Sequence, residues 1–398
     1  MTILLRLRIG PPACAVLAVA GALAAAPGQA PPKVDPRLVR VTVTNPVDVQ
    51  RAGETVVVTL ADLGTLVTFE DPRTLHVRAE GGSELLTQPV DLDDNGTFEQ
   101  LLFQTDLAPR EAKRFTITVG ERRMPRASDF KAYGRFVRER RDDFAWENDR
   151  IAHRMYGEAL ETWAQEPLTS SAVDVWTKRT PRLVVSEWYM VDDYHRDLGE
   201  GADLYSAGKT RGCGGNAPWK DGTLYPSANF RGSRVLANGP IRVLFELTYQ
   251  AWDAGGVSVR ETKRISLDAG QHLDRFESTY SIPADARLQH AVGIRKAPGA
   301  DVSSNTAAGI LRTWEAYKDD NGHMGCGVIV DPASVTASAE ADGNVLLVTS
   351  LSARPVTYYA GFAWDKAGDI PTTADWDRYL DAFARRVRAP ARVELAGQ

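Results

Sequence analysis

The stretch RVLFELTYQAWDAGGVSVRETKRISL, residues 242–267, predicts two antiparallel strands joined by a turn. Its first part alternates apolar and polar side chains, beginning with Val243 and Phe245, and this alternation has the period of a half-buried strand. The turn falls at residues 253–256, where an aspartate and two glycines favour a reversal of the chain. Residues 257–267 then form the second strand.

Segments of the same kind continue toward the C-terminus, over residues 276–282, 327–330, 344–350 and 356–363. Long antiparallel strands spread over so much of the chain predict a large multi-stranded β-sandwich. One helix is predicted near the end, because apolar residues there follow the 3.6-residue period of a helix. They are Trp376, Tyr379, Leu380, Phe383 and Val387.

The N-terminal part has strand patterns of its own, at residues 39–43, 55–60, 75–78, 101–103 and 115–119. These patterns predict a small antiparallel β-sandwich domain over residues 38–121. Residues 122–143 are charged, poorly periodic and rich in arginine, which indicates a connector. The large β domain then covers residues 144–398.

Residues 1–30 have the pattern of a secretory signal peptide. Arg6 and Arg8 precede an apolar stretch over residues 13–26, and small residues follow up to Ala30. The alternative is a short membrane anchor, but the apolar stretch is too short to span a bilayer comfortably. We therefore expect a periplasmic or secreted protein, with no membrane attachment after cleavage. Export makes a disulfide between the two remaining cysteines, Cys213 and Cys326, chemically feasible, and the sequence leaves open whether they pair.

The composition is that of an ordinary soluble globular protein, with 398 residues, 43% hydrophobic and 25% charged. The net charge of −5 and the lack of a basic run interleaved with aromatics argue against nucleic acid as a partner. The sequence has no phosphate-binding glycine loop and no G-x-S-x-G, H-E-x-x-H or C-x-x-C motif. Serine hydrolases, zinc proteases and nucleotide-dependent enzymes are therefore disfavoured. Nothing in the sequence indicates the oligomeric state.

The segment over residues 187–230 carries many titratable and aromatic side chains, many glycines and no apolar periodicity. Such a segment is typical of a site loop, and its mixture suits a sugar, whose faces stack on aromatic rings while its hydroxyls need donors and acceptors. The plainer alternatives are a loop histidine held by a nearby aspartate and a solvated charge pair at Lys209 and Arg211. The candidate residues here are His195, Tyr194, Tyr205 and Glu200 for catalysis, and Lys209, Arg211, Trp219 and Tyr225 for substrate binding.

A second polar-aromatic cluster lies at residues 146–156. Read as a strand, it places Arg150, Arg154 and Tyr156 on one face, where they could line the same cleft. The alternative is an exposed strand face with paired charges. Glu315 lies between Trp314 and Tyr317, so its carboxyl could have a raised pKa.

Residues 91–99 resemble the first part of a calcium loop of the D-x-D-x-N-G type. Asp91, Asp93, Asn95 and Glu99 would supply the oxygens of a structural calcium site. Position twelve of such a loop is Leu102, so the usual bidentate glutamate is missing. The favoured alternative is a plain hairpin with a tight turn at Asn95–Gly96. No other cofactor is required.

Several motifs together resemble the domain-of-unknown-function family 4861. They are the residues at 147–150, 194–205, 208–215, 219–222, 225–227 and 359–361. The resemblance implies an exported bacterial protein with a β-supersandwich of the galactose-mutarotase type, often linked to polysaccharide degradation. That fold class hosts mutarotases, glycosidases, lyases and binding domains, so it does not choose the reaction.

The leading hypothesis is a carbohydrate-active lyase that cleaves a uronate-containing glycan by β-elimination, because the segment offers a base, an acid and cations for the carboxylate. In it Lys209 and Arg211 clamp the carboxylate, His195 is the base and Tyr194 or Tyr205 the acid, while Trp219 and Tyr225 stack on sugar rings. The first alternative is a glycosidase that pairs Glu200 or Asp193 with Glu315, or an epimerase that pairs His195 with a glutamate. The second alternative is a glycan-binding protein without activity. The sugar, its linkage and the exo or endo mode are not indicated.

Overall fold

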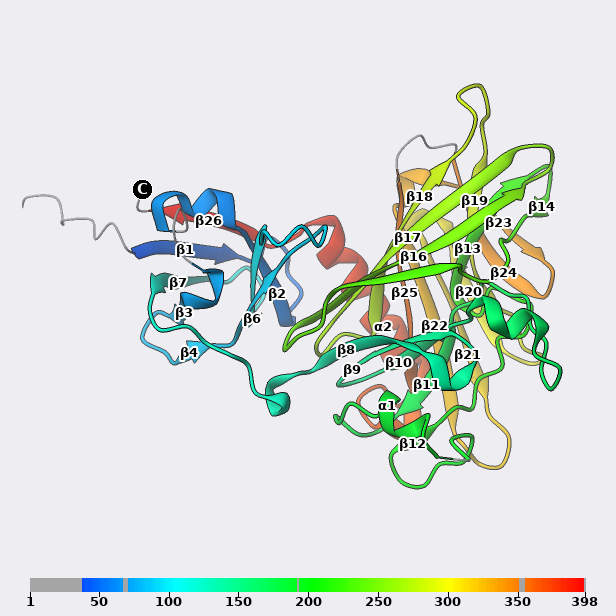
Figure 1. Ribbon diagram of the computed structural model, residues 1–398, viewed down its shortest axis with the longest axis horizontal. Coiled ribbons are helices and arrows are strands. Elements are labelled where there is room, and N and C mark those ends of the chain that lie inside the picture. Colours follow the sequence, from blue (N-terminus) through cyan, green and yellow to red (C-terminus); the bar gives the residue numbers. More distant parts are fainter. Residues whose placement is uncertain (1–37, 67–70, 192, 351–354, 397–398) are drawn as a thin grey trace, which may run out of the picture. The chain divides into compact units, whose positions relative to one another are not determined.

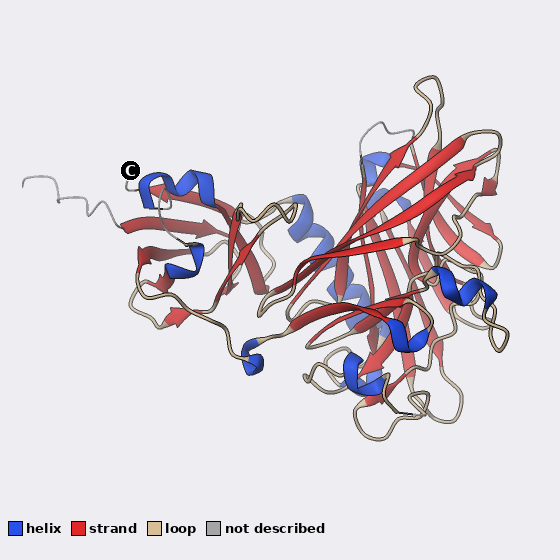
Figure 2. Cartoon of the chain, viewed as in Figure 1, coloured by secondary structure: helices blue, strands red, loops and turns tan. Residues whose placement is uncertain are grey.

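The computed structural model describes residues 38–66, 71–191, 193–350 and 355–396 (Figure 1). Strands dominate this part of the chain (Figure 2), and all the strand pairs in its sheets are antiparallel. Its α-helices are α1 (Val185–Trp188) and α2 (Thr373–Arg388). The mainly β fold with one C-terminal helix is confirmed. No helix among these residues is long and apolar enough to span a bilayer, and the predicted signal peptide at 1–30 lies outside them.

Two sheets form the N-terminal sandwich. A five-stranded sheet has the order β26-β1-β7-β3-β4 and a three-stranded sheet has the order β2-β6-β5. Their apolar faces pack together through residues such as Val41, Phe103 and Phe115. The strands are β1 (Leu38–Thr44), β2 (Arg51–Thr59), β3 (Leu75–Ala79), β4 (Glu84–Leu85), β5 (Thr87–Val90), β6 (Gln100–Leu107), β7 (Ala112–Val119) and β26 (Arg392–Ala396).

Strand β26 is the last strand of the chain, yet it pairs with the first one. Val41 lies opposite Leu395, and Val393 and Leu395 pack against the N-terminal core. Residues 144–398 were expected to form one domain, but this strand belongs to a sheet of the N-terminal sandwich.

Three sheets form the large β region, and their buried side chains share one hydrophobic core. The eight-stranded sheet consists, in spatial order, of β15 (Gly232–Ala237), β16 (Arg242–Asp253), β17 (Ser258–Asp268), β18 (Leu273–Ser281), β25 (Val356–Trp364), β22 (His323–Val330), β21 (Ile310–Ala316) and β20 (Asp301–Asn305). One five-stranded sheet consists of β14 (Thr223–Leu224), β13 (Cys213–Lys220), β19 (Gln289–Arg295), β24 (Asn344–Thr349) and β23 (Val335–Ala341). The other consists of β12 (Gly201–Ala202), β11 (Asp174–Lys178), β10 (Ala152–Met155), β9 (Asp143–Asn148) and β8 (Ala132–Val137).

The stretch at 242–267 forms β16 and β17 as predicted, with Phe245 opposite Ile265. Strand β8 lies within the range 122–143 that was expected to be a connector, and it pairs with β9. Short 3₁₀ turns join the strands. They are η1 (Leu60–Leu66), η2 (Pro72–Thr74), η3 (Ala127–Asp129), η4 (Arg138–Arg140), η5 (Glu158–Thr162), η6 (Thr306–Ala308), η7 (Pro332–Ser334) and η8 (Asp365–Ala367).

Helix α2 packs on the eight-stranded sheet. Its buried residues Trp376 and Leu380 lie against β22 at Gly325 and Gly327, where an added Cβ atom would come within 3 Å of their side chains. Glycine at these two positions therefore allows the helix to approach the strand closely. The Thr372 side chain caps the helix by accepting a hydrogen bond from the Asp375 backbone N–H.

A disulfide joins Cys213 on β13 to Cys326 on β22, so it links a five-stranded sheet to the eight-stranded one. Both residues are buried in the shared core, and their Cα atoms are 5.6 Å apart.

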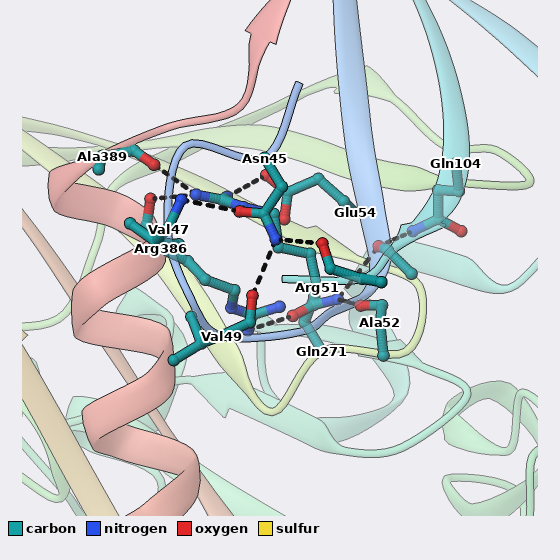
Figure 3. Close-up of polar contacts among 12 residues, drawn as sticks. Asn45, Val47, Val49, Arg51, Ala52, Glu54, Gln104, Gln271, Arg386 and Ala389 are labelled. Atoms are coloured by element: carbon teal, nitrogen blue, oxygen red, sulfur yellow. Dashed lines mark hydrogen bonds and ion pairs between the residues drawn. The ribbon is translucent and has the colours of Figure 1, made fainter. Parts of the chain in front are cut away.

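A buried arginine ties the N-terminal sandwich to the end of α2 (Figure 3). Arg51 on β2 donates from Nη2 to the backbone carbonyls of Arg386 and Ala389, which are free because the helix ends there. Its Nε donates to the Asn45 Oδ1 at 2.7 Å, and its Nη1 pairs with the Glu54 carboxylate at 2.7 Å. One side chain thus caps a helix and holds a strand.

Replacing Arg51 by methionine should lower the free energy of unfolding by about 3 kcal/mol, because it leaves Glu54 without its partner and the helix carbonyls without donors. Chemical denaturation monitored by tryptophan fluorescence measures the change. The matched control is Arg385→Met, which removes an exposed arginine of the same helix paired with Asp48; it should cost less than about 1 kcal/mol. Equal effects of the two substitutions would contradict the capping role.

Candidate active site

A buried arginine between two aspartates forms the floor of the candidate site. Arg154 on β10 lies directly opposite Asp174 on β11, and its Nε donates to Asp174 Oδ2 at 2.6 Å. Its Nη2 donates to Asp203 Oδ2 at 2.9 Å, just beyond β12. The Tyr156 hydroxyl also donates to Asp174 Oδ2, at 2.7 Å. All four side chains are buried. The charge of Arg154 is therefore balanced by carboxyl groups of the protein and not by solvent.

Aromatic rings form the wall above this floor. The rings of Trp176 and Tyr194 stack with their centroids 5.1 Å apart, and the Trp188 ring also stacks on Trp176, at 5.6 Å. The Arg154 guanidinium lies 5.5 Å from the Trp176 ring. Burial raises the pKa of the Tyr194 hydroxyl, so this group holds its proton at neutral pH.

His195 lies at the solvent edge of this wall, with 57% of its side chain exposed. Its Nδ1 lies 3.1 Å from the backbone carbonyl oxygen of Asp203 and 3.4 Å from that residue's Oδ2. A carbonyl oxygen can only accept, so Nδ1 carries the proton in the neutral ring and Nε2 keeps its lone pair. The imidazole centroid is 4.5 Å from the Tyr194 ring. The imidazole and phenol rings therefore lie side by side, and the Tyr194 hydroxyl lies near Arg154.

A pocket of about 190 Å³ opens beside Tyr194. Its charged side chains are Glu187, Asp193, Arg196 and Glu200, and Trp188 and Tyr194 contribute aromatic rings. Glu200 is held by Arg182 at 2.6 Å. Arg196 forms no ion pair with any described residue, so its charge is free for a ligand.

A second polar group adjoins the floor. Arg295 donates from Nη2 to Glu315 Oε1 at 2.6 Å, and its guanidinium lies 4.7 Å from the Tyr205 ring. Burial raises the pKa values of Glu315 and Tyr205, and the charges of Glu315 and Asp174 add to the rise for Tyr205. Four buried polar atoms of the two groups have no hydrogen-bond partner among the described residues. They are Arg154 Nη1, Asp203 Oδ1, Tyr205 Oη and Arg295 Nε. Donors and acceptors left over beside aromatic rings are typical of a site for a polar ligand.

The structure brings together most of the predicted site residues. Tyr194 and Glu200 line the pocket, and His195 lies next to it through its contact with the Tyr194 ring. Arg154 and Tyr156 lie in the floor, and Tyr205 and Glu315 lie in the adjoining group.

The expected clamp of Lys209 and Arg211 is wrong. Arg211 is 1% exposed, and its guanidinium donates to Ser171 Oγ at 3.1 Å in the interior of the large β region. Burial lowers the pKa of Arg211 to about 10. Lys209 is exposed on the preceding turn. The two cations therefore point to different environments and cannot hold one carboxylate.

Three other predicted residues lie away from the site. Arg150 precedes β10 and pairs with Asp369 at 3.4 Å, so it does not share a face with Arg154 and Tyr156. Trp219 lies near the end of β13, opposite Leu224 and Gln289, and it does not line the pocket beside Tyr194. Tyr225 is tied to that strand through its backbone N–H, which donates to the Pro218 carbonyl. Sugar stacking on Trp219 and Tyr225 stays a prediction, but not at the His195 pocket.

Three residues of the site were not predicted from the sequence: Asp174, Asp203 and Arg295. Asp174 interrupts the apolar run of β11, and an isolated aspartate inside such a run is buried with a partner or has a function. The sequence therefore contained a signal for Asp174, but it did not show that Asp174 pairs with Arg154.

The predicted calcium loop lies between β5 and β6. Ligand atoms of Asp91, Asp93 and Glu99 lie within 4.8 Å of one another. The Asp91 carboxylate accepts hydrogen bonds from the backbone N–H groups of Asp94 and Gly96, each at 2.7 Å, and Asn95 accepts from Thr97. The two strands pair as a hairpin, with Val90 opposite Gln100. The connection is this longer loop, so the expected tight turn at Asn95–Gly96 is wrong, and calcium binding stays a prediction.

The Asp203 carboxyl is expected to make the stability of the folded protein depend on pH. Burial raises its pKa to about 8, against the opposing effect of Arg154, from an ordinary value of 3.8. Between these values the folded state holds a proton that the unfolded state releases, so this group makes stability fall as pH rises. We expect Asp203→Asn to flatten that fall in thermal denaturation, because asparagine resembles the neutral carboxyl.

The control is Asp129→Asn. Hydrogen bonding to Arg126 lowers the pKa of Asp129 below the ordinary value of 3.8. The contribution of Asp129 to the free energy of unfolding therefore changes only below about pH 3.8. In Asp129→Asn the slope of stability against pH, between pH 3.8 and 8, should stay as in the wild type. An unchanged slope in Asp203→Asn would contradict the raised pKa of Asp203.

The fold and the site define an antiparallel β-supersandwich protein with an exposed histidine and a half-buried tyrosine beside a buried arginine–carboxylate floor. Two solved structures share the fold at 10% sequence identity. An alpha-mannosidase from Enterococcus faecalis V583 has a TM-score of 0.50 over 91% of this chain and 46% of its own. A protein in the glycosyl hydrolase family 38 from Enterococcus faecalis has a TM-score of 0.51 over 90% of this chain and 47% of its own. The chain thus spans a little under half the length of these two proteins.

The chain belongs to the family described as domain of unknown function (DUF4861), whose model matches residues 43–393. The uncharacterized protein P7 of Formosa agariphila is 33% identical over 373 residues, which are 89% of this chain and 93% of the relative.

Proposed function

We propose that this protein is a carbohydrate-active lyase that cleaves a uronate-containing glycan by β-elimination. The observation that carries the proposal is the exposed imidazole of His195, whose Nδ1 donates to the Asp203 carbonyl so that Nε2 keeps its lone pair, and whose ring lies against that of the protonated Tyr194. The two proteins of similar fold, an alpha-mannosidase and a member of glycosyl hydrolase family 38, favour a carbohydrate substrate.

The reaction needs a base, an acid and a cation that neutralises the carboxylate, and one residue is proposed for each role. His195 Nε2 takes the proton from the carbon next to the carboxylate. The electron pair of that C–H bond forms a C=C bond, the bond to the glycosidic oxygen breaks, and Tyr194 donates its proton to the leaving oxygen. Arg196, which lines the pocket with Tyr194, neutralises the carboxylate in place of the Lys209–Arg211 clamp. Proton exchange with solvent restores His195 and Tyr194.

Purified protein incubated with a panel of uronate-containing polysaccharides tests this function. Elimination produces an unsaturated uronate that absorbs in the ultraviolet, together with new reducing ends. We expect both signals with at least one polymer of the panel, and loss of both in Tyr194→Phe. Cleavage without ultraviolet absorbance would overturn the lyase in favour of a hydrolase.

A glycosidase is the second candidate, because Asp193 and Glu200 line one pocket and two carboxyl groups are what glycoside hydrolysis uses. Glu315, the partner first expected, pairs with Arg295 in the adjoining group instead. A glycan-binding protein without activity would show affinity but no cleavage, with the affinity lost in Trp219→Ala and kept in His195→Ala.

A further inference from the structure

A second pocket lies far along the chain from His195, between strand β2, strands β17 and β18 and the last turns of α2. Its volume is about 220 Å³. Arg51, Gln271 and Arg386, three of its lining residues, are drawn in Figure 3.

The pocket carries more positive than negative charge. Four arginines and two acidic residues line it, which leaves an excess of two positive charges. Arg51 pairs with Glu54 at 2.7 Å and Arg242 pairs with Asp268 at 2.6 Å. Arg275 pairs with Glu277, which lies outside the lining, at 2.6 Å. One cation, Arg386, remains without an acidic partner.

Arg386 is only 8% exposed, and it forms no ion pair with a described residue. It donates to Gln271 Oε1 at 3.3 Å, the Tyr379 hydroxyl is a hydrogen-bonding neighbour, and its guanidinium lies 4.9 Å from the Phe383 ring. Arg51 lines the same pocket and donates to the backbone carbonyl of Arg386 at 3.3 Å. The negative end of the helix dipole favours a cation at the C-terminus of α2. Two other arginines of the last turns already supply positive charge there from the surface. Arg385 pairs with Asp48, and Arg388 donates to the Ala308 carbonyl.

The remaining walls of the pocket include apolar and aromatic side chains, among them Leu273, Tyr359 and Phe383. An arginine fork matches the two oxygens of a carboxylate or a sulfate, and an aromatic wall suits the face of a sugar ring. We propose that this pocket is a second binding site, which takes the oxyanion of an acidic saccharide residue, with Arg386 as its principal ligand and Arg275 at its open side. The oxyanion chemistry follows from this pocket alone, whereas the choice of a saccharide rests on the proposed function.

Titration calorimetry with four probes tests this site: glucuronate, a galactose sulfate, inorganic sulfate and neutral glucose. We expect the two acidic sugars to bind and glucose not to bind, with affinities that fall as salt is added. The tighter of the two acidic sugars identifies the oxyanion as carboxylate or sulfate. Binding of inorganic sulfate alone would remove the saccharide from the proposal, and binding of glucose as tight as that of glucuronate would overturn the oxyanion site.

Arg386→Gln should weaken the binding of the acidic sugar at least about tenfold, because a charged hydrogen bond is lost. Arg275→Gln should weaken it less. The matched control is Arg388→Gln, on the same helix turn but outside the pocket, which should bind like the wild type. Unchanged affinity in Arg386→Gln would overturn the assignment, provided that its thermal unfolding shows a folded protein. Cleavage activity at His195 is measured separately, so the failure of either proposal is seen independently of the other.

Discussion

Replacing His195 by alanine is expected to lower kcat for glycan cleavage by about 10²–10⁴-fold, the usual contribution of a positioned general base. The side chain is 57% exposed, and its hydrogen bond is to the Asp203 backbone carbonyl, so its loss leaves the buried Arg154 floor intact. Stability should therefore change by less than about 0.5 kcal/mol. The initial rate of ultraviolet absorbance at saturating substrate measures kcat.

His323 provides the matched control, because it is 50% exposed and its Nδ1 is also held by an acidic residue, Asp365, at 2.9 Å. Its other ring contact is Trp314, outside the His195 pocket. His323→Ala should keep wild-type kcat. If both variants are equally active, His195 is not the base and the lyase mechanism fails.

Removing the disulfide, by Cys213→Ala together with Cys326→Ala, should lower the free energy of unfolding by about 4–5 kcal/mol. The bond closes a loop with a sequence separation of 113 residues, and a cross-link of that length strongly restricts the unfolded chain. Alanine avoids placing an unpaired hydroxyl in the core. The midpoint and slope of denaturant unfolding give the free energy.

A reducing agent should shift the unfolding midpoint of the wild type toward that of the double variant and leave the variant unchanged. Wild-type unfolding that is insensitive to reductant, with an equally stable double variant, would show that the two cysteines are not bonded in solution.

Local patterns were sufficient to predict the fold class. The alternation at 242–267 forms β16 and β17, and the helical period at the C-terminus forms α2, because burial of one face imposes a period that the sequence must carry. Strand β26 could not be recognised in this way. It is short, and its pairing with β1 joins residues at opposite ends of the chain, for which no local signal exists.

The site was predicted in part for the same reason. The segment at 187–230 identified His195, Tyr194 and Tyr205, since titratable and aromatic groups without apolar periodicity are visible in sequence. Their companions come from elsewhere: Asp174 from β11, Arg154 from β10 and Arg295 from β19. Arg211, by contrast, was assigned to the site by proximity in sequence and is buried in the interior.

The sequence by itself determined that this chain folds into antiparallel sheets and that a polar, aromatic, glycine-rich segment carries its chemistry, because both properties follow from residues close together along the chain. Only the tertiary structure decided which charges meet. Arg154 and Asp174 pair across neighbouring strands, and Arg386 is left without an acid at the end of α2. The physical reason is that electrostatic partnership depends on distance in space and on burial, and the register of the strands and the packing of the helix set both.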